Sequence, residues 1–278
     1  MDLSIGLPFM KGHGTGNDFV VVADFNDELN LTADMVSTIC DRHRGIGADG
    51  LLRVVREGDT YFMDYRNADG TLAETCGNGL RVFARFLVEN GLEKAGTFDV
   101  LTRAGVVQAT VSANDTNFDN IAIRMGQPTF TDVETNPEVT TEVDTWTGVA
   151  VTMPNPHCVT VIDDMMMAGS LHELPTVTPA SVFPEGVNIE FVEARGLNHI
   201  GMRTYERGVG ETLACGSGSC AAAAVWADRE NLAAPWTVQV DILGGTVFVD
   251  GDTDGFVTLR GPARFVASGV ISPELVAF

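Results

Sequence analysis

Hydrophobic and polar residues alternate with a period of two along most of the chain, which predicts a protein built mainly from β-strands. In the first half, this pattern predicts six strands: Asp18–Asp24, Leu51–Arg56, Tyr61–Arg66, Phe98–Thr102, Val106–Val111 and Asn120–Met125. In the second half, it predicts eight: Val149–Met153, Cys158–Ile162, Val187–Val192, Ile200–Tyr205, Thr237–Ile242, Thr246–Val249, Phe256–Leu259 and Phe265–Ala267. Turns rich in Gly, Asn and Asp separate these segments.

Helical patterns are fewer. One helix is expected over Thr32–His43, with Thr32 as its N-cap, and another near Asp164–Leu174. Apolar residues recur at helical spacing over Leu80–Val88, and Gly91 ends that helix. The segment Cys220–Ala227 is apolar on every side, which indicates a buried helix.

The last two helices follow a repeated turn. Residues 74–79 read Glu-Thr-Cys-Gly-Asn-Gly, and residues 211–218 read Glu-Thr-Leu-Ala-Cys-Gly-Ser-Gly. The two cysteines, Cys76 and Cys215, lie 139 residues apart, which is half of the 278-residue chain. Such a repeat predicts an α+β fold of two similar, pseudo-symmetric lobes, each with a curved, mostly antiparallel sheet wrapped around a central helix. An active site is expected in the cleft between them.

The boundary between the lobes is expected within a stretch rich in Thr, Asp, Glu and Pro, residues 127–147. We place the N-terminal lobe at residues 1–126, with residues 266–278 returning to it, and the C-terminal lobe at residues 127–265.

The chain is strongly acidic. It holds 38 Asp and Glu against 17 Lys and Arg, a formal net charge of −21, and only two of the cations are lysines. This charge argues against binding of nucleic acid or of an anionic membrane surface. It keeps a protein soluble by self-repulsion, and it is also typical of a halophilic protein, because molar salt reduces the Debye length to about 3 Å.

The chain shows no targeting signal and no run of about 18 apolar residues, so we expect a cytoplasmic protein without a membrane partner. Its five cysteines are then expected to be thiols. Cys40, Cys158 and Cys220 lie among apolar neighbours and are predicted to be packed side chains.

Cys76 and Cys215 differ, because each comes directly before a predicted helix. The first amides of a helix have no acceptor within it, and the helix dipole is positive there. Such an end binds a carboxylate and favours a thiolate over a thiol. Two thiols on opposite faces of one carbon could remove a proton and return another, inverting the centre, while the amides stabilise the carbanion.

The sequence does not support a metal site, a dinucleotide-binding motif or a pyridoxal phosphate site. The pair Cys215 and Cys220 has no second pair or nearby His to complete a metal site, and C-x-x-C is absent. Residues 45–50 match the dinucleotide pattern G-x-G-x-x-G, but they follow a helix and open a strand, so we expect a plain loop. Neither Lys11 nor Lys94 suits a pyridoxal phosphate Schiff base. We expect no metal and no cofactor.

Several further motifs occur in a characteristic order: residues 14–19 (GTGNDF), 41–49 (DRHRGIGAD), 67–70 (NADG), 76–79 (CGNG), 155–158 (NPHC), 187–191 (VNIEF), 205–208 (YERG) and 210–218 (GETLACGSG). With these motifs, nearly the whole chain resembles the diaminopimelate epimerase family. The resemblance implies a cofactor-independent isomerase of lysine biosynthesis that converts LL-2,6-diaminopimelate to the meso isomer, with a homodimer as a candidate assembly.

The resemblance also assigns roles to residues. Cys76 and Cys215 would be the two bases, and His157 and Glu206 would set their protonation states. The substrate would be held by a set of amides, side-chain amides and charged groups: Asn17, Asn67, Gly77, Asn78, Asn155, Asn188, Glu206, Arg207, Gly216 and Ser217.

The chemistry of these side chains suits a double zwitterion. Arg207 can bind a distal carboxylate with two hydrogen bonds, and Glu206 can accept from an ammonium group. Two positions depart from the family pattern: Gly50 stands where some members have a substrate-binding glutamine, and Pro154 replaces a glycine.

Alternative functions remain open at this point. A proline-racemase-like enzyme of the same architecture would lack the distal recognition set. A non-catalytic amino-acid binding protein would not need paired thiols, and a Cys-His hydrolase would use one cysteine and leave the repeat unexplained.

Overall fold

The structure, a computed structural model, describes residues 6–276 and divides into two compact units. Unit 1 comprises the chain up to Ile123 together with the segment from Gly261 onward, and unit 2 comprises Arg124–Arg260.

The described part of unit 1, residues 6–123 and 261–276, contains three α-helices and eight strands, of which β7 runs on into unit 2. The helices are α1 (Ala33–Cys40), α2 (Gly77–Glu89) and α4 (Pro273–Val276). The strands are β1 (Leu7–Gly14), β2 (Asn17–Ala23), β3 (Gly50–Glu57), β4 (Thr60–Asn67), β5 (Gly96–Thr102), β6 (Gly105–Val111), β7 (Ile121–Gly126) and β19 (Arg264–Ile271).

Unit 2 is built around one long helix, α3 (Gly216–Arg229), with two short 3-10 helices, η2 (Met165–Ala168) and η3 (Ala180–Val182). Its strands are β8 (Thr129–Phe130), β9 (Glu138–Thr140), β10 (Thr145–Thr152), β11 (Pro156–Ile162), β12 (Thr176–Thr178), β13 (Asn188–Gly196), β14 (His199–Glu206), β15 (Gly210–Thr212), β16 (Trp236–Ile242), β17 (Gly245–Gly251) and β18 (Val257–Gly261).

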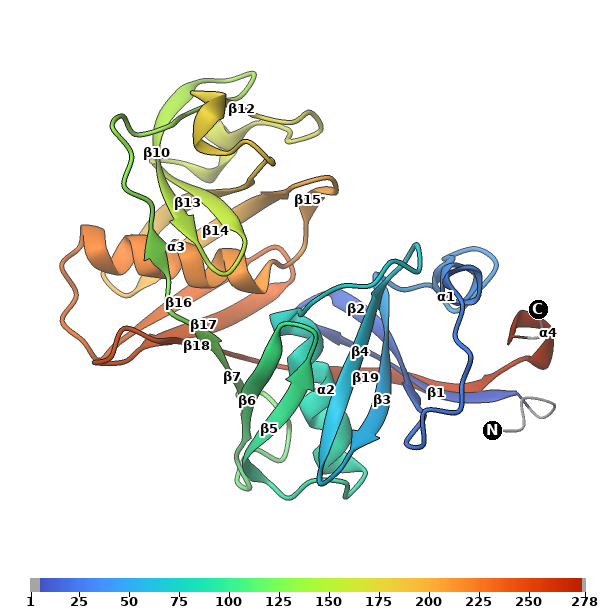
Figure 1. Cartoon of the computed structure of the whole chain (residues 1–278). Helices are drawn as coiled ribbons and strands as arrows, with labels where there is room; N and C mark the ends of the chain where they lie inside the picture. The colour runs from blue at the N-terminus through green and yellow to red at the C-terminus, as the bar shows by residue number, and fades with distance from the viewer. Residues whose placement is uncertain (1–5, 277–278) are drawn as a thin grey trace. The chain divides into compact units, whose positions relative to one another are not determined.

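The two units repeat one pairing pattern. In unit 1, β1–β2 pair antiparallel, β2–β3 parallel, β3–β4 antiparallel, β4–β5 parallel and β5–β6 antiparallel. In unit 2, the same alternation runs through β10–β11, β11–β13, β13–β14, β14–β16 and β16–β17. In each unit, the long helix lies on the connection between the second parallel pair (Figure 1). The predicted α+β fold with an internal repeat is confirmed.

Each long helix is wrapped by its own strands. Helix α3 contacts β10, β11, β13, β14, β16 and β17, and every residue from Gly218 to Ala227 is buried. Helix α2 contacts β1, β2, β3, β4 and β6. The sequence pattern predicts a one-sided apolar stripe on α2, but Arg81 is also fully buried, because its guanidinium donates to the Pro262 carbonyl and the Thr15 hydroxyl.

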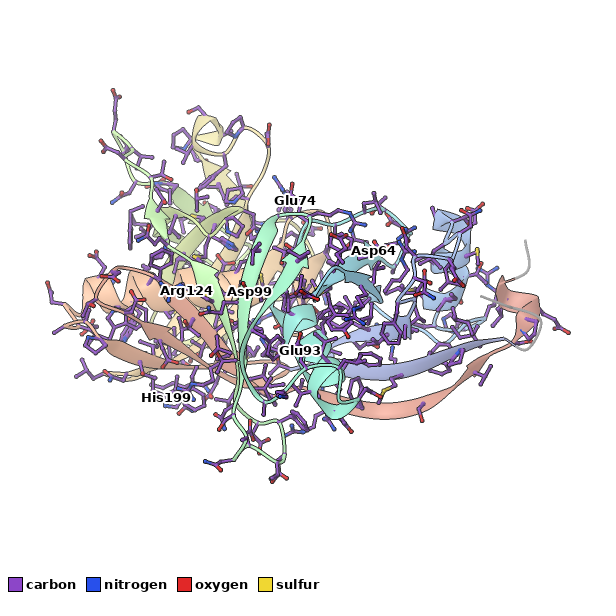
Figure 2. All side chains as sticks on the ribbon, turned by 60° about the horizontal axis from the view of Figure 1, so that its bottom comes forward. Asp64, Glu74, Glu93, Asp99, Arg124 and His199 are labelled. Atoms are coloured by element: carbon purple, nitrogen blue, oxygen red, sulfur yellow. The ribbon has the colours of Figure 1, made fainter. Side chains whose placement is uncertain are left out.

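Buried charge also occurs on the strands of unit 1. Asp64 of β4 is 1% exposed and lies among the strands (Figure 2). It forms ion pairs with Arg53 (Nε to Oδ2, 2.8 Å), Arg66 (Nη2 to Oδ2, 3.1 Å) and Arg103. A single carboxylate thus forms ion pairs with arginines from β3, β4 and the turn between β5 and β6.

The fourteen predicted strands all occur, but the pattern missed five. Strand β1 and the short strands β8, β9, β12 and β15 have too little alternation to stand out. The helix expected over Asp164–Leu174 is wrong: only η2 forms there, with Asp164 as its N-cap, and Gly169 (φ 76°) ends it after one turn.

The remaining helices agree with the sequence. Thr32 caps α1, which ends at Cys40 rather than near His43, because the Asp41 carboxylate accepts the amides of His43 and Arg44 in a turn. The glycine-rich segment 45–49 is the predicted loop between α1 and β3, and Gly50 is the first residue of β3.

Candidate active site

Cys76 is the N-cap of α2. Its backbone is extended (φ −151°, ψ 118°), its carbonyl accepts from the Leu80 amide at 2.8 Å, and its sulfur accepts from the Gly79 amide at 3.5 Å. The thiol occupies the place that Ser or Asp takes in an ordinary cap. The amides of Gly77 and Asn78 are the first two of the helix, where no carbonyl of the helix can accept from them.

Asn17 contacts the Cys76 sulfur, and Asn78 contacts Asn17. The thiol donates to Asn17 Oδ1 at 3.5 Å, and Asn78 Nδ2 donates to the same oxygen at 3.3 Å. Asn17 Nδ2 donates to Asp49 Oδ2 at 2.8 Å. A carboxylate only accepts, so Asp49 fixes the amide of Asn17 with its oxygen toward Cys76.

Cys215 occupies the same place at the start of α3. It also has extended backbone (φ −118°, ψ 113°), and its sulfur accepts from the Gly218 amide at 3.3 Å. Its carbonyl accepts from the Ser219 amide at 2.9 Å, and Ser217 Oγ lies 3.6 Å from the sulfur. The two caps therefore have one geometry, repeated in the two units.

The pKa of the Cys215 thiol is shifted upward, whereas the helix N-terminus alone is expected to lower it. Burial raises the pKa of the Cys215 thiol well above its usual range, and the carboxylates of Glu206 and Glu190 raise it further. Hydrogen bonds from Ser217 and Gly218 lower it by less. The sequence shows the favourable dipole, but it does not show that the folded chain places two acids against a desolvated sulfur.

His157 is fully buried on β11 and uses both ring nitrogens within the protein. Its Nδ1 lies 2.7 Å from Glu190 Oε1, and its Nε2 lies 3.0 Å from Asn155 Oδ1. The pair with Glu190 forms because β11 and β13 run parallel, with His157 opposite Asn188.

Asn188 and Arg207 are also brought together. The backbone amide of Arg207 donates to Asn188 Oδ1 at 3.0 Å, while Arg207 Nη1 donates to the Glu185 carbonyl at 2.9 Å. The Arg207 side chain is exposed and lies across Gly186, whose φ of +83° and missing side chain leave room for it. Glu206 Oε1 accepts from the Thr212 hydroxyl at 2.5 Å.

Known proteins are similar to this chain along most of its length. The family model described as diaminopimelate epimerase matches residues 9–131 and 149–266. The chain is 41% identical to the diaminopimelate epimerase of Streptomyces coelicolor over 283 residues, covering 96% of each chain. It is also 41% identical to that of Corynebacterium glutamicum, covering 97% of this chain and 99% of the relative.

The chain belongs to the diaminopimelate epimerase family.

Solved structures show that the fold extends beyond this family. A phenazine biosynthesis protein of Bacillus anthracis superimposes with a TM-score of 0.71 at 18% identity, covering 95% of this chain and 98% of that one. A probable proline racemase from Agrobacterium radiobacter gives a TM-score of 0.69 at 14% identity, covering 95% and 92%. These likenesses establish that the chain shares its fold with both proteins.

The two departures from the family pattern lie in different surroundings. Gly50 pairs with Asn67 in the β3–β4 ladder, and a Cβ there would lie 2.5 Å from the Arg66 carbonyl oxygen and 2.8 Å from the Tyr65 ring. The strands are thus too close at this point for a glutamine. Pro154 is exposed and precedes Asn155 in the turn between β10 and β11.

The structure joins the expected site residues into two groups, one in each unit. Unit 1 brings Cys76, Asn17 and Asn78 together, whereas the Asn67 side chain donates to the Thr71 hydroxyl. Unit 2 gathers most of the others: Asn155, His157, Asn188, Glu206, Arg207, Cys215, Gly216 and Ser217.

Two residues at the site were missed from the sequence. Asp49 orients Asn17, and Glu190 binds His157. A signal for Glu190 was present, because it is the one charged residue in the apolar run 187–192. A charge in a buried strand requires a partner, and such residues are often functional. Asp49 looked like an ordinary turn residue.

Within residues 6–276, no cluster of three or more His, Cys, Asp or Glu side chains is arranged to hold a metal ion. In the same part of the chain, no helix is long and apolar enough to cross a membrane.

Proposed function

We propose that this protein inverts one α-carbon of LL-2,6-diaminopimelate to give the meso isomer, as an isomerase of lysine biosynthesis. The observation that carries the proposal is the duplicated cap: each unit presents one cysteine as the N-cap of its central helix with the same backbone conformation. A reaction that treats the two faces of a carbon alike requires two such groups. The names of the curated relatives supply the substrate.

The proposed reaction is a proton transfer without a cofactor. One cysteine, as the thiolate, removes the α-proton, and the other, as the thiol, gives a proton to the opposite face. The carbanion between these steps is stabilised through its carboxylate by the amides of Gly77, Asn78, Gly216 and Ser217. A positioned acid or base of this kind contributes about 10²–10⁴ in rate.

The remaining polar groups would bind the rest of the substrate. Glu206 and the side-chain amides of Asn17, Asn67, Asn155 and Asn188 can receive ammonium groups or donate to carboxylates. The exposed guanidinium of Arg207 can bind the distal carboxylate with two hydrogen bonds. A proline-racemase-like activity is not favoured, because proline has no distal amino-acid group for these residues to bind.

Solvent isotope exchange tests the proposal. LL-diaminopimelate is incubated with the protein in D2O without pyridoxal phosphate, and deuterium at the α-carbon is followed by NMR. We expect one deuterium in each newly formed meso molecule, because the returned proton comes from a thiol in exchange with solvent. Proline in the same buffer is expected to remain unlabelled. A folded protein that introduces no deuterium into diaminopimelate would exclude this chemistry.

We further propose that the enzyme works in the cytoplasm at high salt, and that a homodimer is a candidate assembly. The net charge of −21 supports adaptation to salt, as do exposed acids such as Glu134, Glu173 and Asp254. Repulsion among exposed acids destabilises the folded state at low ionic strength and is screened as salt rises.

Raising KCl from 0.1 to 3 M is therefore expected to raise both the Tm and the epimerase rate. Circular dichroism and a coupled epimerase assay measure the two quantities. Sucrose at matched osmolality serves as the control and should leave the rate unchanged. Full stability and full activity at 0.1 M KCl would contradict salt adaptation and leave the acidity as a means of solubility alone.

A further inference from the structure

Glu190 is a fully buried carboxylate for which the reaction proposed above assigns no role. It lies on β13, where it faces Val159 on β11 and Thr204 on β14 in the strand register. Its side chain is 0% exposed. Its Oε1 receives the bond from His157, while no described residue donates a hydrogen bond to its Oε2. Burying a carboxylate with one oxygen that accepts no hydrogen bond is unfavourable for packing alone, so a further role is indicated.

The contact with His157 sets the state of the imidazole ring. An ionised carboxylate only accepts hydrogen bonds, so the proton of the 2.7 Å contact belongs to His157 Nδ1. The other ring nitrogen, Nε2, points away from Glu190 to a different partner. Nε2 lies 3.0 Å from Asn155 Oδ1, which accepts a hydrogen bond when Nε2 is protonated.

The same carboxylate lies against the start of α3. A Cβ placed on Gly218 would lie 2.6 Å from Glu190 Oε1 and 3.1 Å from Cys215 Sγ. The carboxylate oxygen and the sulfur therefore lie on either side of the position that a side chain at residue 218 would occupy, and only glycine leaves that position empty. Among the described residues, the carboxylate of Glu206 on β14 also acts on this sulfur through its charge, and His157 on β11 contacts Glu190.

A negative charge at this place opposes a second one on the sulfur. Burial raises the pKa of the Cys215 thiol, and Glu206 and Glu190 add to the effect through their charges. At Cys76, the thiol donates to the side-chain amide oxygen of Asn17. The duplicated caps are alike in backbone conformation, and the Cys215 cap lies near the two carboxylates of Glu206 and Glu190.

We infer that Glu190 is a positioning residue for the proposed epimerisation: it holds His157 with its proton on Nδ1 and keeps Cys215 as the thiol in the substrate-free protein. The thiol form of Cys215 is then the one that the folded protein favours before substrate binds. The inference rests on the proposed function for its catalytic consequence, but the thiol state of Cys215 is measurable without any substrate.

The test is the variant Glu190→Gln, which keeps the shape and removes the charge. We expect iodoacetamide to alkylate Cys215 at least tenfold faster at pH 7.5, as located by peptide fragmentation, with the rate profile moved to lower pH. In the epimerase assay, we expect kcat to fall at least tenfold while KM stays within about threefold. Glu190→Asp keeps the charge, so iodoacetamide should alkylate its Cys215 at a rate close to that of wild type. This variant can also be measured if Glu190→Gln folds poorly.

The matched control is Glu193→Gln on the same strand, where the carboxylate accepts from the Met165 amide. Equal alkylation rates in Glu190→Gln and wild type would overturn the inference, and so would equal acceleration in Glu193→Gln. The two proposals fail separately. If wild type shows no epimerisation but Glu190→Gln still alkylates faster, the thiol-state assignment stands and the proposed function is wrong.

Discussion

Replacing either Cys76 or Cys215 by Ala is expected to lower the rate of epimerisation by a factor of about 10²–10⁴. Each variant loses one of the two groups that exchange a proton with the α-carbon in the proposed reaction. The folded state should persist, because both caps keep their carbonyl bonds, from Leu80 to Cys76 and from Ser219 to Cys215.

Isotope exchange distinguishes the roles of the two cysteines, whereas a loss of turnover alone does not. A variant with one thiol can still remove a proton from one isomer and return a deuteron to the same face. We therefore expect each variant to introduce deuterium into a single isomer without inversion, and the two variants to label opposite isomers. NMR of each isomer after incubation in D2O measures this, and it assigns each cysteine to one stereochemistry.

The control is Cys40→Ala. Cys40 is buried on α1, and burial raises the pKa of its thiol to about 12, so it is no proton donor or acceptor for a substrate. This variant should keep kcat within about twofold and lose a little stability. Full epimerase turnover in Cys76→Ala or Cys215→Ala would refute the assignment of two bases.

The second large effect is on stability. Asp64→Ala is expected to lower the free energy of unfolding by about 3–5 kcal/mol, because it removes the carboxylate that Arg53, Arg66 and Arg103 share. Arg53 keeps its ion pairs with Asp24 and Asp27, whereas Arg66 and Arg103 would be left half-buried without the shared carboxylate. Urea unfolding followed by circular dichroism, at one fixed salt concentration, measures the change.

Acid should remove the same contribution from the wild-type protein. Burial raises the pKa of Asp64, but hydrogen bonds and charge from Arg66 and Arg103 outweigh it and hold the pKa below its usual range. A group with a lowered pKa stabilises the fold above its unfolded pKa of about 3.9 and loses that effect as the pH falls toward the folded value. Asp64→Ala should therefore lose less stability than wild type between pH 5 and pH 2.

Asp99→Ala is the matched control, since Asp99 is an exposed aspartate on a strand of the same unit (Figure 2). It should change the free energy of unfolding by less than about 0.5 kcal/mol. Equal effects of the two substitutions would show that the three-arginine cluster does not stabilise unit 1.

Much of this protein is visible in its sequence because the signals are local. A period of two marks a strand wherever one face is buried, so all fourteen predicted strands form. The residues that can cap a helix precede α1, α2 and α3, and Gly91 (φ 67°) follows the end of α2. The repeated Cys-Gly-X-Gly turn identified both cysteines, because a cap is formed by residues that are adjacent in the chain.

The predictions failed where a local signal was ambiguous or weak. The apolar residues over Asp164–Leu174 suit a helix, yet only the single turn of η2 forms, since Gly169 adopts a positive φ. Strand β15 has three residues, too few to show alternation. A stripe on α2 predicted one buried face, but the strands of unit 1 also enclose Arg81.

The sequence by itself therefore determined the α+β class, the internal repeat and the two cysteine caps, because each is visible in short stretches of adjacent residues. Only the tertiary structure decided which charges those caps meet. Glu190 reaches His157 across the parallel pair β11 and β13, Asp49 orients Asn17 from 32 residues away, and Cys215 is buried beside two acids. Protonation depends on distance and desolvation in space, and strand register and packing set both.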